Sequence, residues 1–154
     1  MSEGMPKTLE AEVSALQRIP MFQGVDAKRL KLLAFASERI SFSVGQKLFS
    51  QGDPSDFAYV ILEGSADIFI NGHEGMVKVA QFTEHQMVGE MGILTRNPRS
   101  ATVIAASPMT VLRINKDVFF ELTSHFPQMG MAVMVELAVR LEQSNARLVE
   151  FLTK

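Results

Sequence analysis

The stretch GEMGILTRNPRSATV, residues 89–103, brings two glycines, one glutamate and two arginines close together. Gly89 lets another molecule approach the backbone closely, and the residues after it are long enough for about one helical turn. The first N–H groups of such a turn lack internal partners, so they attract an anion. A turn at Asn97-Pro98 then leads to Arg99, whose guanidinium can hold a phosphate through two parallel hydrogen bonds.

Glu90 narrows the choice of ligand. A carboxylate beside a phosphate would be repelled by it, so Glu90 must face a hydrogen-bond donor. The 2′-hydroxyl of a 3′,5′-cyclic nucleotide is such a donor and lies next to the phosphate. One carboxylate, one guanidinium and an amide-rich turn therefore match that ligand. The alternative is a glycine-rich turn that carries only a surface ion pair between Glu90 and Arg99.

The segments around this stretch predict short strands separated by tight turns. Turn signals such as Gly45, Gly52-Asp53 and Glu63-Gly64 recur at about the length of a strand. Asn71-Gly72 predicts a hairpin turn because both residues tolerate positive φ. The expected strands are residues 47–50, 57–62, 66–70, 76–82, 101–106 and 109–114. We expect an α+β fold that is mainly β, with an antiparallel β-roll or jelly-roll barrel over about residues 40–114.

Helices are expected at both ends of a single domain spanning residues 1–154. The N-terminal helices cover about residues 8–36, with Asp26 as a helix cap. The C-terminal helices cover about residues 116–152, with Asn115 as a cap and Pro127 opening the longer one. That helix carries an apolar stripe, which is expected to be a core face, a lid over a ligand, or both: Met134, Leu137, Ala138 and Leu141, extended by Asn145, Leu148 and Leu152.

The 89–103 stretch resembles the phosphate-binding cassette of the cyclic-nucleotide-binding domain family. In that cassette Gly-Glu opens a short helix and Pro-Arg-Ser/Ala-Ala-Thr follows. Glu90 and Arg99 are nine positions apart, as in the kinase-regulatory and channel branches of the family. Two further patterns resemble earlier turns of the family, so the resemblance covers most of the chain: Gly45-x-x-Leu48-Phe49-x-x-Gly52-Asp53 and Leu62-x-Gly64.

The resemblance implies roles for the polar residues of the cassette. Glu90 would bind the ribose 2′-hydroxyl, and Arg99 would bind the exocyclic phosphate oxygens. Backbone contacts would come from Gly89, Met91 and Gly92. Position 92 departs from the family, in which alanine is common, and we expect a slightly looser turn there.

The resemblance also implies the surroundings of the nucleotide. Ser100 and Ala101 would line the phosphate and the edge of the base, although Ser100 also suits an ordinary strand serine. Arg140 would cap the purine from the last helix, although it also suits a solvated helix face. An apolar wall would enclose ribose and purine: Ile68, Ala80, Phe82 and Val88, the last replacing a common phenylalanine.

The expected function is a regulatory sensor whose C-terminal helices close over cAMP. We expect cGMP less, because guanine-preferring members often carry threonine where Ser100 stands. The expected partners are the cyclic nucleotide and a downstream protein. The alternative is a member of the fold that has no ligand and acts as a protein-interaction module.

Composition and missing motifs exclude several other classes. A net charge of −2 does not suggest a nucleic-acid or acidic-membrane partner. The chain has no cysteine, and His73, His85 and His125 are scattered without metal-ligand spacing. No P-loop, no G-x-S-x-G motif and no apolar run of about 18 residues is present. We expect a cytoplasmic, stand-alone sensor or a fragment of a larger protein, with no enzymatic activity, metal or cofactor.

Overall fold

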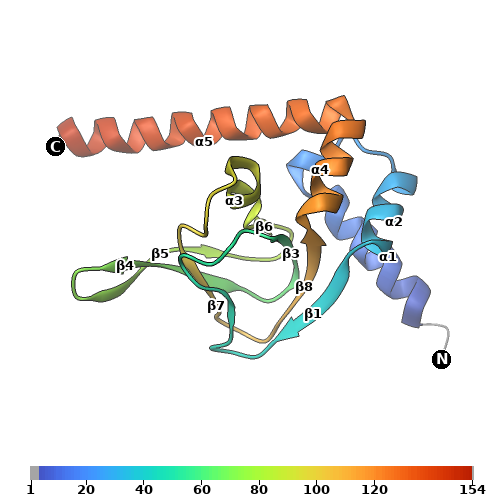
Figure 1. Cartoon of the computed structure of the whole chain (residues 1–154), viewed down its shortest axis with the longest axis horizontal. Helices are drawn as coiled ribbons and strands as arrows, with labels where there is room; N and C mark the ends of the chain where they lie inside the picture. Colours follow the sequence, from blue (N-terminus) through green and yellow to red (C-terminus); the bar gives the residue numbers. More distant parts are fainter. Residues whose placement is uncertain (1–3, 154) are drawn as a thin grey trace.

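The structure is a computed structural model and describes residues 4–153. Over these residues two helices and a short 3-10 helix precede a set of strands, one helix interrupts the strands, and two helices follow (Figure 1). The helices are α1 (Gly4–Gln17), η1 (Pro20–Phe22), α2 (Ala27–Phe35), α3 (Glu90–Thr95), α4 (Lys116–His125) and α5 (Pro127–Thr153). The strands are β1 (Glu38–Phe42), β2 (Lys47–Phe49), β3 (Phe57–Glu63), β4 (Ala66–Gly72), β5 (Gly75–Phe82), β6 (Met87–Val88), β7 (Thr102–Ala105) and β8 (Met109–Asn115).

The strands form two four-stranded sheets, in the orders β1-β8-β3-β6 and β2-β7-β4-β5. Every strand pair is antiparallel. Figure 1 shows α1, α2 and α4 grouped at one end of the roll, with α5 passing over α3. The predicted α+β, mainly β fold is therefore confirmed.

Two apolar clusters hold the site in place. The larger one joins the helices to one side of the roll, and Phe22, Phe119 and Ile93 are at most 2% exposed within it. The second cluster fills the roll itself and includes Val88 and Ile68. Since Ile93 lies on α3, and Val88 lies just before it, the 89–103 segment is anchored to both clusters.

The helix caps follow the sequence predictions. The Asp26 side chain accepts a hydrogen bond of 3.1 Å from the N–H of Arg29 at the start of α2. The Asn115 side chain accepts one of 2.7 Å from the N–H of Asp117 at the start of α4. Both caps are local interactions, which explains why the sequence indicates them.

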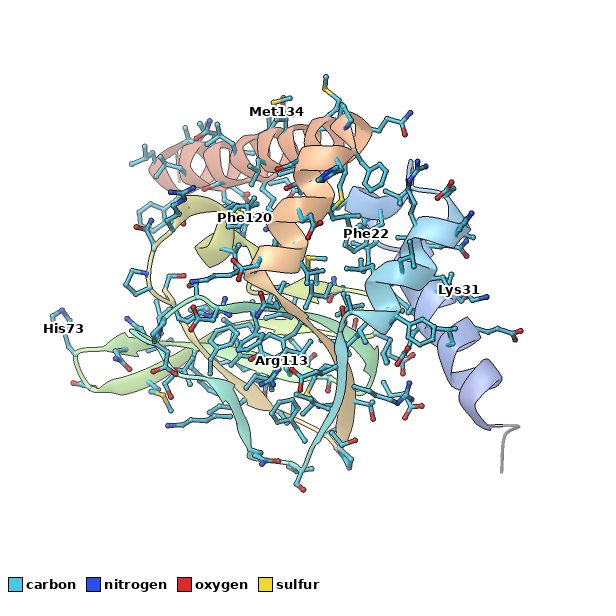
Figure 2. All side chains as sticks on the ribbon, turned by 45° about the vertical axis from the view of Figure 1, so that its right-hand side comes forward. Phe22, Lys31, His73, Arg113, Phe120 and Met134 are labelled. Carbon is cyan, nitrogen blue, oxygen red and sulfur yellow. The ribbon has the colours of Figure 1, made fainter. Side chains whose placement is uncertain are left out.

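The hairpin between β4 and β5 turns later than predicted. Asn71 and Gly72 continue β4, and Gly72 pairs with Gly75, so His73 and Glu74 form the tip (Figure 2). Gly75 adopts a φ of +118°, which glycine tolerates best. The turn therefore lies directly before Gly75, the residue that adopts the positive φ, and not at Asn71-Gly72. The strands β1 and β6 were not predicted, since β6 has only two residues and β1 is polar and partly exposed.

Of the apolar stripe predicted on the last helix, Leu137 packs on the domain, whereas Met134 and Leu141 do not. Met129 and Val133 are buried and Leu137 packs against the same cluster, at four-residue spacing. Met134 is 58% exposed and points away from the domain (Figure 2), and Leu141 is 62% exposed. The helix has two apolar sides, and periodicity alone does not say which one meets the core.

Candidate ligand-binding site

Gly89 opens α3 in a conformation and a space that only glycine suits. Its φ is +89°, and a Cβ at this position would lie 2.5 Å from Nη1 of Arg99. Its carbonyl accepts a hydrogen bond of 2.6 Å from that same nitrogen. Because Gly89 has no side chain, the guanidinium of Arg99 can lie directly against its backbone.

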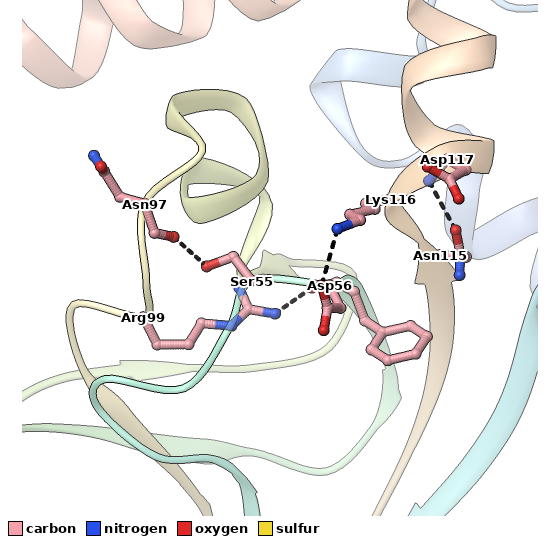
Figure 3. Close-up of polar contacts among 8 residues, drawn as sticks. Ser55, Asp56, Asn97, Arg99, Asn115, Lys116 and Asp117 are labelled. Atoms are coloured by element: carbon pink, nitrogen blue, oxygen red, sulfur yellow. Dashed lines mark hydrogen bonds and ion pairs between the residues drawn. The ribbon is translucent and has the colours of Figure 1, made fainter.

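Gly92 is explained by the loop between β2 and β3. A Cβ at Gly92 would lie 2.8 Å from Cβ of Ser55 and collide with the Ser55 hydroxyl. That hydroxyl donates a hydrogen bond of 2.6 Å to the carbonyl of Asn97 (Figure 3). The departure at position 92 thus makes room for a hydrogen bond between the β2–β3 loop and the segment after α3.

Arg99 is a buried cation that forms no ion pair within residues 4–153. The residue is 5% exposed, and its guanidinium donates to the carbonyl of Gly89 and to that of Phe57, the second of which Figure 3 draws. It also lies 4.0 Å from the ring centroid of Phe49. The Nε donor is buried without a hydrogen-bond partner, and among the described residues no carboxylate forms an ion pair with Arg99. Burial lowers the pKa of Arg99, as expected for a desolvated cation.

The backbone around Arg99 is fixed by the same loop. The N–H of Arg99 donates to the carbonyl of Asp53, and the N–H of Gly52 donates to the carbonyl of Arg99, both at 2.8 Å. Asp56, in the same loop, forms an ion pair of 3.1 Å with Lys116 at the start of α4 (Figure 3). The β2–β3 loop therefore connects the cassette to the C-terminal helices.

Glu90 is buried and pairs with the last helix. Its side chain is 5% exposed, and its Oε1 lies 2.8 Å from Nη2 of Arg140 on α5. Glu136, one turn earlier on α5, lies at the same distance from that nitrogen. Burial raises the pKa of Glu90, and Arg140 acts in the opposite direction. Burial acts to lower the pKa of Arg140, but the two carboxylates outweigh it and the pKa is raised.

These contacts rule out the simplest alternative. Glu90 and Arg99 do not form a surface ion pair, because both are buried and each has other partners. Arg140 does not lie on a solvated face as a free cation. It holds Glu90 and Glu136, and its side chain is 40% exposed.

A cavity of about 200 Å³ lies between α3, the segment after it and the roll. It contains nine of the twelve residues proposed from the sequence, together with Phe49 and Val103: Ile68, Phe82, Val88, Gly89, Met91, Gly92, Arg99, Ser100 and Ala101. Phe49 belongs to the pattern Gly45-x-x-Leu48-Phe49-x-x-Gly52-Asp53, so the sequence marked it as a residue that resembles the family. Its stacking on Arg99 could be seen only in three dimensions.

Three predicted residues do not line the cavity. Glu90 and Arg140 are not among its lining residues, and they form the ion pair that joins α3 to α5. Ala80 was expected in the apolar wall, but it is exposed on the edge strand β5, opposite Ile68. Every other residue of β5 before Phe82 is exposed as well, and only Phe82, the last one, is partly covered and lines the cavity.

The described residues contain neither a metal-binding cluster nor a membrane-spanning helix. No group of three or more His, Cys, Asp or Glu residues suited to a metal ion is present between residues 4 and 153. Over the same range no helix is both long enough and apolar enough to span a membrane.

Comparison with known proteins gives consistent results. The family model described as the cyclic nucleotide-binding domain matches residues 39–126. A cAMP-dependent protein kinase regulatory subunit from Aspergillus niger is 30% identical over 104 residues, which are 68% of this chain and 25% of that protein. This chain therefore spans about a quarter of that curated relative.

Solved structures share the fold. The sensor domain of the transcriptional regulator DNR from Pseudomonas aeruginosa superposes with a TM-score of 0.81 at 20% identity, covering 91% of this chain and 95% of that one. The regulatory domain of Toxoplasma gondii PKA, crystallised with cAMP, superposes with a TM-score of 0.75 at 23% identity, covering 88% and 51%. The family predicted from the cassette is confirmed.

Proposed function

Because this chain belongs to the cyclic nucleotide-binding domain family, we propose that it binds cAMP in the cavity beside α3 and responds by closing α5 over the ligand. The observation that carries the proposal is that Arg99 is buried and forms no ion pair within residues 4–153. A buried cation is costly unless an anion compensates it, and here the acceptors are two neutral carbonyls. A phosphate in the cavity would supply the missing charge.

The guanidinium has donors left for that phosphate. It carries five N–H groups, and the carbonyls of Gly89 and Phe57 take one donor from each terminal nitrogen. The ring of Phe49 holds the guanidinium plane by stacking. The free N–H groups of the first turn of α3 would add further donors to the anion.

Glu90 would bind the ribose and also couple ribose binding to α5 through its ion pair with Arg140. In our proposal one carboxylate oxygen accepts a hydrogen bond from the 2′-hydroxyl while the other stays with Arg140. The Arg140 side chain is partly exposed and could then reach the purine, as predicted from the family resemblance. The junction between α4 and α5 suits such a movement, since Phe126 has an extended backbone with φ −125° and ψ 92°.

The preference for cAMP rests on Ser100 and on the relatives. Ser100 lines the cavity in place of the threonine of many guanine-preferring members. The A. niger relative is a cAMP-dependent kinase subunit, and the T. gondii domain was crystallised with cAMP. The apolar wall of the cavity, which includes Ile68, Phe82 and Val88, would pack against the purine without a base-specific donor.

The proposal is tested by calorimetric titration of the whole chain with cAMP, cGMP and 2′-deoxy-cAMP. Arg99→Ala should weaken cAMP binding by about 30-fold or more, since removing one member of a buried charge pair typically costs roughly 2–5 kcal/mol. The 2′-deoxy analogue should lose about tenfold or more, the value of a hydrogen bond to a charged acceptor.

The matched control is Arg96→Asn, three residues away. Arg96 is exposed and has a φ of +58°, a conformation that asparagine tolerates, so cAMP affinity should be unchanged. Circular dichroism checks that each variant is folded. An undiminished affinity of Arg99→Ala, or no binding of either nucleotide by the unaltered chain, would contradict the proposal and favour the protein-interaction module.

A further inference from the structure

The outward side of α2 carries cations and large apolar side chains together. The buried residues of this helix face the domain, and four residues at spacings of three and four form the opposite side: Lys28, Lys31, Leu32 and Phe35. Leu32 is 64% exposed and Phe35 is 71% exposed. Lys31 points away from the domain (Figure 2). Large apolar side chains exposed side by side and bordered by charge are typical of an interaction site.

The charge on this side of α2 is positive. Within the part of the chain that the structure describes, neither Lys28 nor Lys31 forms an ion pair. Residues 27–36 contain no carboxylate. The nearby carboxylates Glu10 and Glu121 line grooves on the two flanks of α2 but do not pair with these lysines. Both ammonium groups are therefore available to an acidic partner.

A cavity of about 360 Å³ opens beside the exposed side, between α2 and α4, which lie at the same end of the roll (Figure 1). Six of its nine lining residues are apolar, and Leu32 belongs both to the cavity and to the exposed side of α2. Phe126 also lines it, and its ring centroid lies 4.5 Å from Cζ of Arg29. Such a cavity suits a large apolar side chain, the kind of anchor that carries most of the binding energy at protein interfaces.

We propose that α2 and α4 form a docking site for an acidic amphipathic helix of a partner protein. That helix would lie along α2, with one large apolar side chain in the cavity and carboxylates opposite Lys28 and Lys31. Leu32 and Phe35 would be shielded from water in the complex. The surface contains none of the residues that line the candidate ligand-binding cavity, so the proposal does not rest on the proposed nucleotide.

The cavity favours a helix over an anionic membrane as the occupant. The surface of a bilayer is broad and would leave a cavity between two helices unfilled. Two apolar side chains and two lysines are also a weak membrane anchor, since stable attachment takes a larger apolar face or a lipid chain in addition to basic residues. A partner helix fills a groove with anchors at three- and four-residue spacing, which matches the spacing on α2.

The test begins with a library of random helical peptides displayed on phage and selected on the whole chain without nucleotide. Enriched peptides should combine carboxylates with a large apolar residue, and one of them is then titrated by fluorescence anisotropy. Lys31→Glu should weaken its binding about tenfold or more, because like charges would face each other. Lys47→Glu is the matched control and should leave the affinity unchanged, since Lys47 is exposed on β2, in the opposite part of the molecule's sheet structure.

Leu32→Ser tests the apolar half of the site and should also weaken binding about tenfold or more. Val44→Ser is its control, because Val44 is 62% exposed in the β1–β2 loop. Circular dichroism checks that each variant is folded. Vesicles of phosphatidylcholine and phosphatidylglycerol provide the comparison with a membrane, and the chain should not sediment with them. A selection that enriches no acidic peptide, affinities that Lys31→Glu and Leu32→Ser leave unchanged, or sedimentation with the vesicles would overturn the proposal.

Discussion

The ion pair between Glu90 and Arg140 gives a quantitative prediction for Arg140→Ala. Breaking a fully buried pair costs about 3–5 kcal/mol, whereas an exposed pair contributes about 0–1 kcal/mol. The Glu90 side chain is 5% exposed and that of Arg140 is 40% exposed, so this pair lies between those limits. We expect Arg140→Ala to lower the free energy of unfolding by about 1–3 kcal/mol at neutral pH.

The cost should depend on pH in a defined direction. Burial raises the pKa of Glu90, and removal of Arg140 should raise it further because Arg140 acts to lower it. A carboxyl whose pKa is higher in the folded protein favours folding most below its unfolded pKa, and this gain is lost as pH rises through the folded pKa. The destabilisation by Arg140→Ala should therefore shrink at mildly acidic pH, where Glu90 can accept a proton.

The assay is urea unfolding at both pH values of the unaltered chain, Glu90→Gln, Arg140→Ala and the double variant. In the Glu90→Gln background, Arg140→Ala should cost less and lose its pH dependence, since the two changes remove the same contact. Arg147→Ala, on an exposed part of α5, is the control and should have little effect. Additive costs, or a pH dependence equal to that of Arg147→Ala, would refute the assignment of Arg140 as the partner that stabilises the buried carboxylate.

Two further predictions concern the cassette and the last helix. Gly92→Ala should destabilise the fold by about 1–3 kcal/mol through its collision with Ser55, and Ser55→Gly should recover most of that loss in urea unfolding. Recovery that fails would mean that the alanine strains α3 itself. On addition of cAMP, the amides of α5 from Val133 onward should exchange more slowly with deuterium, because the proposed closure packs this helix against the ligand. Unchanged exchange there, with cAMP bound, would exclude closure.

Local sequence patterns predicted those features that depend on residues close together in the chain. Gly89 predicted a close backbone approach, and the structure gives it a positive φ beside Arg99. Asp26 and Asn115 predicted helix caps because a cap forms within one turn. The cassette was identifiable for the same reason: its glycines, carboxylate and guanidinium all lie within one short segment.

Features that depend on contacts between distant segments could be read only from the folded structure. Arg140 pairs with Glu90 fifty positions earlier in the chain, and Phe49 of β2 stacks on Arg99, so no local pattern could show either contact. Ala80 lies outside the cavity because only the last residue of β5, Phe82, is covered by the rest of the roll, which depends on how the two sheets pack. On α5 the periodicity revealed an apolar side, but the packing of Val133 against the domain decided that the side containing Leu141 stays exposed. A spacing can mark an apolar face, but only the arrangement of the other elements determines what covers it.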